Sequence, residues 1–117
     1  MKVKKFEDLE IWKRSTVLCV EVYKLGESIK NHAFAAHIGR TGLSISSNIA
    51  EGFEREGDKE FIRFLIISRG SCGELRSQLY IGIKTNYIKI EVGEKLIDET
   101  RQISAMISGL IKFRRNK

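Results

Sequence analysis

The segment FIRFLIISRGSCGELRSQLYIG, residues 61–82, carries the clearest periodic pattern in the sequence. Its apolar and small residues recur at alternating spacings of four and three: Phe61, Leu65, Ser68, Cys72, Leu75, Leu79 and Gly82. This heptad period is typical of helices that pack with a slight left-handed twist. Asp58 and Glu60 place negative charge in the first turn, where the helix dipole favours it. The segment therefore predicts a long helix that buries one face.

Apolar residues at helical spacing predict three further helices. Near the N-terminus, one apolar set is Leu9, Trp12, Thr16, Cys19 and Tyr23, and a second set, Ile11, Leu18, Val22, Leu25 and Ile29, lies about 100° further round the same helix. The other two segments carry the stripes Phe34, Ile38, Thr41, Ile45, Ile49 and Leu96, Thr100, Ile103, Ile107, Leu110. The charged residues of the first helix, Arg14 among them, gather on its remaining side.

The composition also favours a helical fold. The chain has 117 residues, of which 42% are hydrophobic and none is proline. This length suits one domain with its own core, and the absence of proline suits long, uninterrupted helices. Four amphipathic helices with short connections predict a single domain over residues 1–117, folded as an all-α, antiparallel up-and-down four-helix bundle. In that topology both chain ends lie at the same end of the bundle.

The segment SISSNIAEGFER, residues 44–55, is open to two interpretations. A nucleophilic serine needs a nearby base and an orienting group. The motif GxSxG is absent, and the only histidines are His32 and His37. Small residues also let helices approach closely, and serine hydroxyls can bond to carbonyls of their own helix. We therefore predict a packing segment here and no catalytic residues.

Polar residues around this segment predict a structural network. Glu51 and Arg55 are four residues apart, a spacing that favours an ion pair along one helix. If the chain turns back near residues 55–57, Arg40 comes opposite Glu74, and these two are expected to pair across helices. The predicted network comprises Arg40, Asn48, Glu51, Arg55, Ser71 and Glu74.

The remaining sequence features exclude several protein classes. Cys19 and Cys72 are far apart within apolar helical patterns and are expected to be buried, reduced thiols. Ligand spacing for a zinc site is lacking, so we predict no metal and no cofactor. The start MKVKKFEDLEIWK returns to charge too soon for a signal peptide, and no apolar run approaches the roughly 20 residues of a membrane span. We expect a cytoplasmic protein with no membrane partner.

The net charge of +6 is concentrated at the two chain ends. Residues 1–5 and 112–117 form short basic termini without acidic side chains, and their seven basic residues are Lys2, Lys4, Lys5, Lys112, Arg114, Arg115 and Lys117. Residues 6–111 carry 14 basic and 15 acidic side chains and are nearly neutral. Because the bundle brings its ends together, these residues predict a surface that binds phosphates without strong sequence preference.

Several motifs resemble one bacterial family. SISSNIAEGFER, then DKEFIRFL and GSCGELRSQL, and the opening FEDLEIWKRSTVLCVEVY, resemble the four-helix bundle proteins encoded by intervening sequences in 23S rRNA genes. The resemblance covers residues 6–88, with Ser46 standing where the family often has proline. It implies a cytoplasmic bacterial four-helix bundle without enzymatic activity, and a homo-oligomer, best a ring of five. It also implies a relation to the accessory protein of diversity-generating retroelements, which works with a reverse transcriptase and nucleic acid.

These features are compatible with three classes of function. The first is an oligomeric accessory protein that binds RNA or DNA through its basic termini. The second is a protein-interaction scaffold without nucleic acid, which the surplus apolar residues of the first and third helices favour. The third, a metal-dependent nuclease, is the weakest, because such enzymes need clustered carboxylates and the acidic residues here look scattered.

Overall fold

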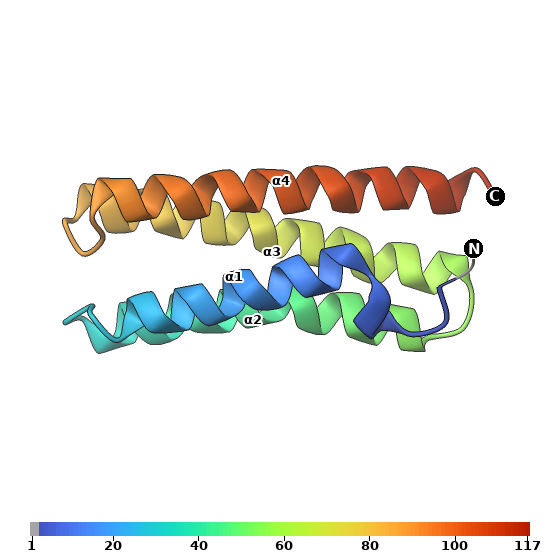
Figure 1. The fold of residues 1–117 in the computed structure, drawn as a ribbon, viewed down its shortest axis with the longest axis horizontal. Helices are drawn as coiled ribbons and strands as arrows, with labels where there is room; N and C mark the ends of the chain where they lie inside the picture. Colours follow the sequence, from blue (N-terminus) through green and yellow to red (C-terminus); the bar gives the residue numbers. More distant parts are fainter. Residues whose placement is uncertain (1–2) are drawn as a thin grey trace.

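The computed structural model describes residues 3–117 and confirms the predicted bundle. A short 3-10 helix, η1 (Phe6–Asp8), precedes four long helices: α1 (Glu10–Gly26), α2 (His32–Glu54), α3 (Asp58–Lys84) and α4 (Ile90–Arg115). Figure 1 shows them running up and down along the same axis, with the N- and C-termini at one end. The bundle measures 45 × 20 × 19 Å. We call the end that holds both termini and the α2–α3 turn the terminal end.

Local chemistry explains where the helices begin and end. Asn31 is the N-cap of α2, and its side chain accepts a hydrogen bond from the backbone N–H of Phe34 at 3.0 Å. Gly57 precedes α3 with φ at +85°, a conformation that glycine adopts without strain. At the end of α3, Asn86 has φ at +64°, and the Tyr87 N–H donates to the Gly82 carbonyl at 2.9 Å. This is a Schellman ending, which satisfies carbonyls that the last turn leaves free.

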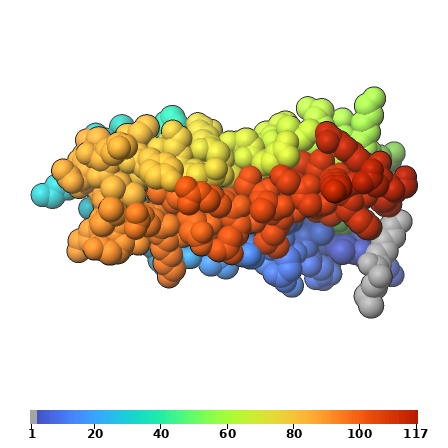
Figure 2. Space-filling view, turned by 90° about the horizontal axis from the view of Figure 1, so that it is seen from above, coloured from blue at the N-terminus to red at the C-terminus, as the bar shows by residue number. Residues whose placement is uncertain are grey.

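The core follows the predicted stripes. All seven predicted positions of α3 are buried, as are Ile38, Thr41, Ile45 and Ile49 of α2. In α4 the stripe from Leu96 to Ile107 is buried, and the last buried residue of the helix is Ile111. Seen from the side that α4 covers, this helix runs the length of the molecule between α1 and α3 (Figure 2). The predicted pattern of burial is therefore confirmed for three of the four helices.

Helix α1 differs from the prediction. Its second apolar set supplies most of the core, with Ile11, Leu18 and Val22 buried. Tyr23, which belongs to the first set, is 49% exposed and lies against Gly39 of α2. Arg14, on the charged side of the helix, turns toward α4, and its side chain is 31% exposed. The pattern therefore predicted the helix but not which part of its broad apolar surface faces the core.

Candidate functional site

The terminal end brings the two basic termini together, as the topology predicts. Val3 from the start of the chain and Arg114 and Lys117 from its end line the same cavity. Lys4, Lys5, Lys112 and Arg115 are exposed and lie within two residues of these lining residues along the chain. None of these four takes part in an ion pair within residues 3–117. Lys2, the remaining basic residue of the predicted surface, lies outside the described residues.

Two of the basic residues are held by one carboxylate. Arg114 donates from Nη1 to Oδ1 of Asp58 at 2.6 Å, and Nζ of Lys117 lies 3.6 Å from Oδ2 of the same side chain. Arg114 lowers the pKa of Asp58 below its ordinary value, and Lys117 adds to the effect. Asp58 begins α3, where the helix dipole favours a negative charge, and Arg114 ends α4, where it favours a positive one. The pair therefore fixes the end of α4 against the beginning of α3.

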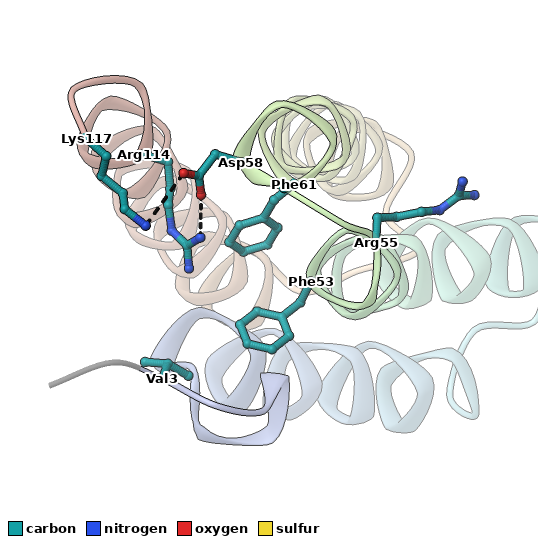
Figure 3. Close-up of a pocket in the computed structure, with 8 residues that line it drawn as sticks. Val3, Phe53, Arg55, Asp58, Phe61, Arg114 and Lys117 are labelled. Atoms are coloured by element: carbon teal, nitrogen blue, oxygen red, sulfur yellow. Dashed lines mark hydrogen bonds and ion pairs between the residues drawn. The ribbon is translucent and has the colours of Figure 1, made fainter.

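A cavity of about 300 Å³ opens beside this ion pair (Figure 3). Phe53 of α2 and Phe61 of α3 lie beside it, edge to face, with ring centroids 5.6 Å apart. The guanidinium of Arg114 stacks over the Phe61 ring, 4.8 Å from its centroid. Arg55 contributes to the lining, but its guanidinium points away toward Phe64. The cavity thus combines the partly exposed ring of Phe53 with two cations and one carboxylate.

Acidic residues also gather at the terminal end, a feature that the charges of the chain ends do not predict. The turn between α2 and α3 brings five of them there: Glu51, Glu54, Glu56, Asp58 and Glu60. Arg55 donates to Glu51 at 2.9 Å, and Arg63 donates to Glu60 at 3.1 Å. The terminal end is therefore less positive than its seven basic terminal residues alone suggest. In an up-and-down bundle the α2–α3 turn lies at the same end as the termini, so the charges of that turn have to be counted with those of the chain ends.

The serine-rich segment makes contacts between α2 and α3. The hydroxyls of Ser44 and Ser71 lie 2.9 Å apart, and Nδ2 of Asn48 donates to the Ser44 carbonyl at 2.8 Å and to its hydroxyl at 3.0 Å. The buried Ser68 hydroxyl donates to the Ile45 carbonyl across the two helices at 2.7 Å. Within residues 3–117, no imidazole is hydrogen-bonded to Ser44. This geometry serves packing and supplies no base for a serine nucleophile.

The predicted polar network exists only in pieces. The Glu51–Arg55 ion pair is confirmed, and Asn48 and Ser71 are linked through Ser44. The predicted Arg40–Glu74 pair is wrong, because Glu74 lies opposite His37 instead, with Nε2 and Oε2 3.9 Å apart. Arg40 lies one turn further along α2, is exposed, and forms no ion pair within residues 3–117.

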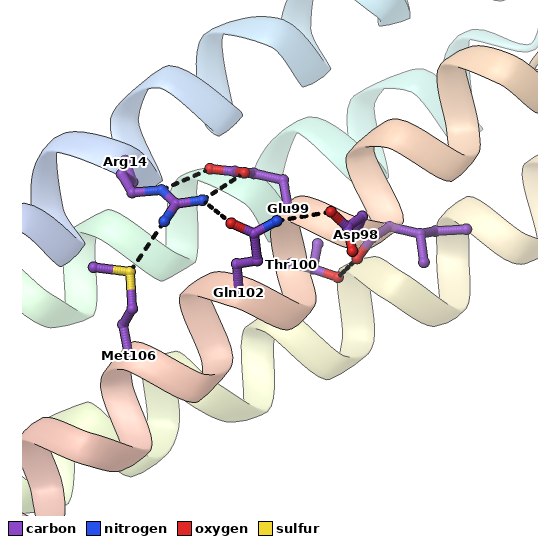
Figure 4. A network of polar contacts seen from close by, with 7 residues as sticks. Arg14, Asp98, Glu99, Thr100, Gln102 and Met106 are labelled. Carbon is purple, nitrogen blue, oxygen red and sulfur yellow. Dashed lines mark hydrogen bonds and ion pairs between the residues drawn. The ribbon is translucent and has the colours of Figure 1, made fainter.

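A second polar network, between α1 and α4, was missed entirely (Figure 4). Arg14 donates to both carboxylate oxygens of Glu99, at 3.0 Å from Nε and 2.7 Å from Nη2. It also donates to Oε1 of Gln102 at 2.7 Å and to the Met106 sulfur at 3.3 Å. The bond to Glu99 raises the pKa of Arg14 above its ordinary value. The spacing of Glu99, Gln102 and Met106 along one face of α4 was the available signal.

The cysteines and the possible metal-binding side chains form no reactive site within residues 3–117. Both cysteines are free and buried, and burial raises the pKa of the Cys72 thiol to about 12, so it stays protonated at neutral pH. The described residues hold no group of three or more side chains that could bind a metal ion. Among residues 3–117, no helix combines the length and the apolar character that crossing a bilayer requires.

Comparison with known proteins identifies the family. None of the curated proteins matches the chain. A crystal structure of a protein with unknown function from the S23 ribosomal protein family, from Bacteroides thetaiotaomicron VPI-5482, is similar over 87% of this chain and 98% of its own, with 25% identity and a TM-score of 0.81. The model of the 23S rRNA-intervening sequence protein family matches residues 7–109. This match spans most of the bundle, and the chain therefore belongs to the 23S rRNA-intervening sequence protein family.

Proposed function

We propose that this protein is a non-enzymatic accessory protein that binds the phosphate backbone of RNA or DNA through its terminal end. The observation that carries the proposal is the meeting of both basic termini around one cavity. Lys4, Lys5, Lys112 and Arg115 are exposed there and are the residues best placed to contact phosphates. Such contacts carry no sequence information by themselves, so the binding is expected to be unspecific.

Salt dependence and a matched charge change test this proposal. Binding of a short single-stranded RNA is measured by fluorescence anisotropy at about 50 mM and about 200 mM salt, since phosphate contacts weaken steeply with salt. Changing Lys4, Lys5, Lys112 and Arg115 to Ala is expected to abolish most of the binding. The control changes four lysines at the opposite end of the bundle: Lys24, Lys30, Lys84 and Lys89. Absence of binding at low salt, or equal loss in both variants, would overturn the proposal.

Exposed apolar side chains favour a second function, as a scaffold that binds protein, including copies of itself. Val17 and Val20 of α1 are 58% and 52% exposed, and Ile81 of α3 is 50% exposed. Also in α3, Gly70 and Gly73 have nothing within 4 Å of where a Cβ would stand, so packing within the chain does not require them. These features support homo-oligomerisation, and the ring of five stays a prediction, as does the relation to retroelement accessory proteins.

Solution mass decides whether the apolar faces are used for self-association. Light scattering is expected to give a multiple of the 13.4 kDa chain mass at micromolar concentration. The variant Ile81→Glu places a charge on the exposed face of α3 and is expected to reduce that mass. A monomer in the unmodified protein would contradict both self-association and this interpretation of the surface.

A further inference from the structure

The cavity at the terminal end holds more hydrogen-bond donors than its own residues satisfy. Asp58 accepts from only one nitrogen of Arg114, and within residues 3–117 the Nε and Nη2 groups of Arg114 have no hydrogen-bond partner. Nζ of Lys117, with three donors, lies 3.6 Å from Asp58, which is longer than a strong hydrogen bond. One carboxylate thus faces two cations, and the cavity keeps a net positive charge.

The shape of the cavity adds a second requirement for its ligand. Its volume of about 300 Å³ lies at the lower limit of small-molecule sites. Half-buried Phe53 gives it an apolar ring surface on the side away from Lys117, as Figure 3 shows, whereas Phe61 is buried beneath the guanidinium of Arg114. A ligand that matches this lining carries a compact anionic group joined to a flat or apolar body.

We propose that the cavity binds one phosphate group of a nucleotide, held by Arg114 and Lys117, with the attached nucleoside against Phe53. This inference rests on the proposed function and names the residues that bind a phosphate of the RNA or DNA, either within its backbone or at its 5′ end. Arg114 is held in position before the ligand arrives, because Asp58 and the Phe61 ring fix its guanidinium. Guanidinium groups match phosphate oxygens with paired donors, which makes such contacts strong.

Asp58 has two opposing effects on such a ligand. Its carboxylate orients Arg114, but it also competes with phosphate for the same donors and repels a second anion. Removing its charge while keeping its shape, as in Asp58→Asn, is therefore expected to strengthen phosphate binding. A purely structural role for the ion pair predicts the opposite, because Asp58→Asn and Arg114→Gln would then weaken the terminal end alike.

Four proteins and three probes test the inference. The proteins are the unmodified chain, Arg114→Gln, Asp58→Asn and the control Arg115→Gln, which removes the same charge from an exposed neighbour outside the cavity. The probes are a short single-stranded RNA with a 5′-phosphate, the same RNA without it, and uridine 5′-monophosphate. We expect Arg114→Gln to weaken binding about tenfold more than Arg115→Gln. We also expect Asp58→Asn to strengthen binding several-fold.

The outcomes separate this inference from the proposed function. A preference for the 5′-phosphorylated RNA assigns the cavity to a terminal phosphate, and equal affinities of the two RNAs assign it to an internal one. Equal weakening by Arg114→Gln and Arg115→Gln, or weakening by Asp58→Asn, overturns the cavity site while general backbone binding stands. Binding of uridine 5′-monophosphate that Arg114→Gln abolishes, without any RNA binding, overturns the proposed function and keeps the site.

Discussion

The contact between α2 and α3 and the contact between α1 and α4 are built in opposite ways. Small residues and serine hydroxyls bring α2 and α3 close together, with Gly52 against Phe64 and Ser44 against Ser71. Between α1 and α4, the long side chains of Arg14 and Glu99 span the space. Of the neighbouring helix pairs, α1 and α4 share the fewest close backbone approaches. The first contact depends on fit and the second on charge.

This difference teaches where change is tolerated. A close contact between small residues has no free space, so an added methyl group forces helices or rings to move. A contact through long, partly exposed charged side chains can adjust, because water and rotamers replace what is lost. The serine-rich segment therefore contributes most through the fit between α2 and α3, and added bulk there is expected to have a larger effect than a lost charge between α1 and α4.

Gly52→Ala is expected to have the largest effect. An ideal Cβ at position 52 would lie 2.5 Å from the Cβ of Phe64 and 3.2 Å from Cδ1 of Phe61, so α2 and α3 would have to separate. We expect a loss of about 1–3 kcal/mol in the free energy of unfolding, measured by urea denaturation. Gly109→Ala is the matched control: no atom lies within 4 Å of its Cβ, and alanine favours a helix by up to about 1 kcal/mol. Stabilisation by both changes would show that the α2–α3 contact has room for a methyl group and does not depend on close fit.

Glu99→Gln is expected to have a moderate effect on the α1–α4 contact. The side chains of Arg14 and Glu99 are 31% and 28% exposed, so losing the carboxylate is expected to cost about 1 kcal/mol of unfolding free energy. The cost should shrink at about 1 M salt, whereas the cost of Gly52→Ala should not, because salt screens charges. Glu94→Gln, at an exposed position of the same helix, is the control. A cost that does not change with salt would mean that packing, not charge, joins these helices.

Much of the fold could be predicted, because the heptad pattern of α3 and the stripes of α2 and α4 depend only on burial of one helix face. The pairing of Arg14 with Glu99 could not, because the sequence does not show how a broad apolar helix such as α1 is rotated in the bundle. The wrong Arg40–Glu74 pair has a similar cause: an error of one turn in the register of two helices changes every partner across them. The meeting of the two basic chain ends could be predicted from the topology, but the cavity between them and the place of Asp58 depend on tertiary contacts.

The Asp58–Arg114 pair is a charge-based contact between the ends of two helices, α3 and α4, and the smallest effect is expected there. Arg114 lowers the pKa of Asp58 below its ordinary value of 3.8, so the ionised carboxylate stabilises the fold at neutral pH. This contribution should be lost as the pH falls below about 3.8 and through the lowered pKa. In acid unfolding, the stability difference between the unmodified protein and Asp58→Asn is expected to shrink over that range. A difference that does not change with pH would show that the pair does not stabilise the fold.

Ser44→Ala, measured for both unfolding and RNA binding, tests most directly whether the serine-rich segment packs helices rather than performs chemistry. The change removes the hydroxyl that meets Ser71 and Asn48, and leaves the Ser71 hydroxyl without this partner. We expect the free energy of unfolding to fall by about 1 kcal/mol. RNA affinity should stay the same, because the proposed RNA-binding residues lie at the terminal end. Unchanged stability together with lost RNA binding would contradict the account.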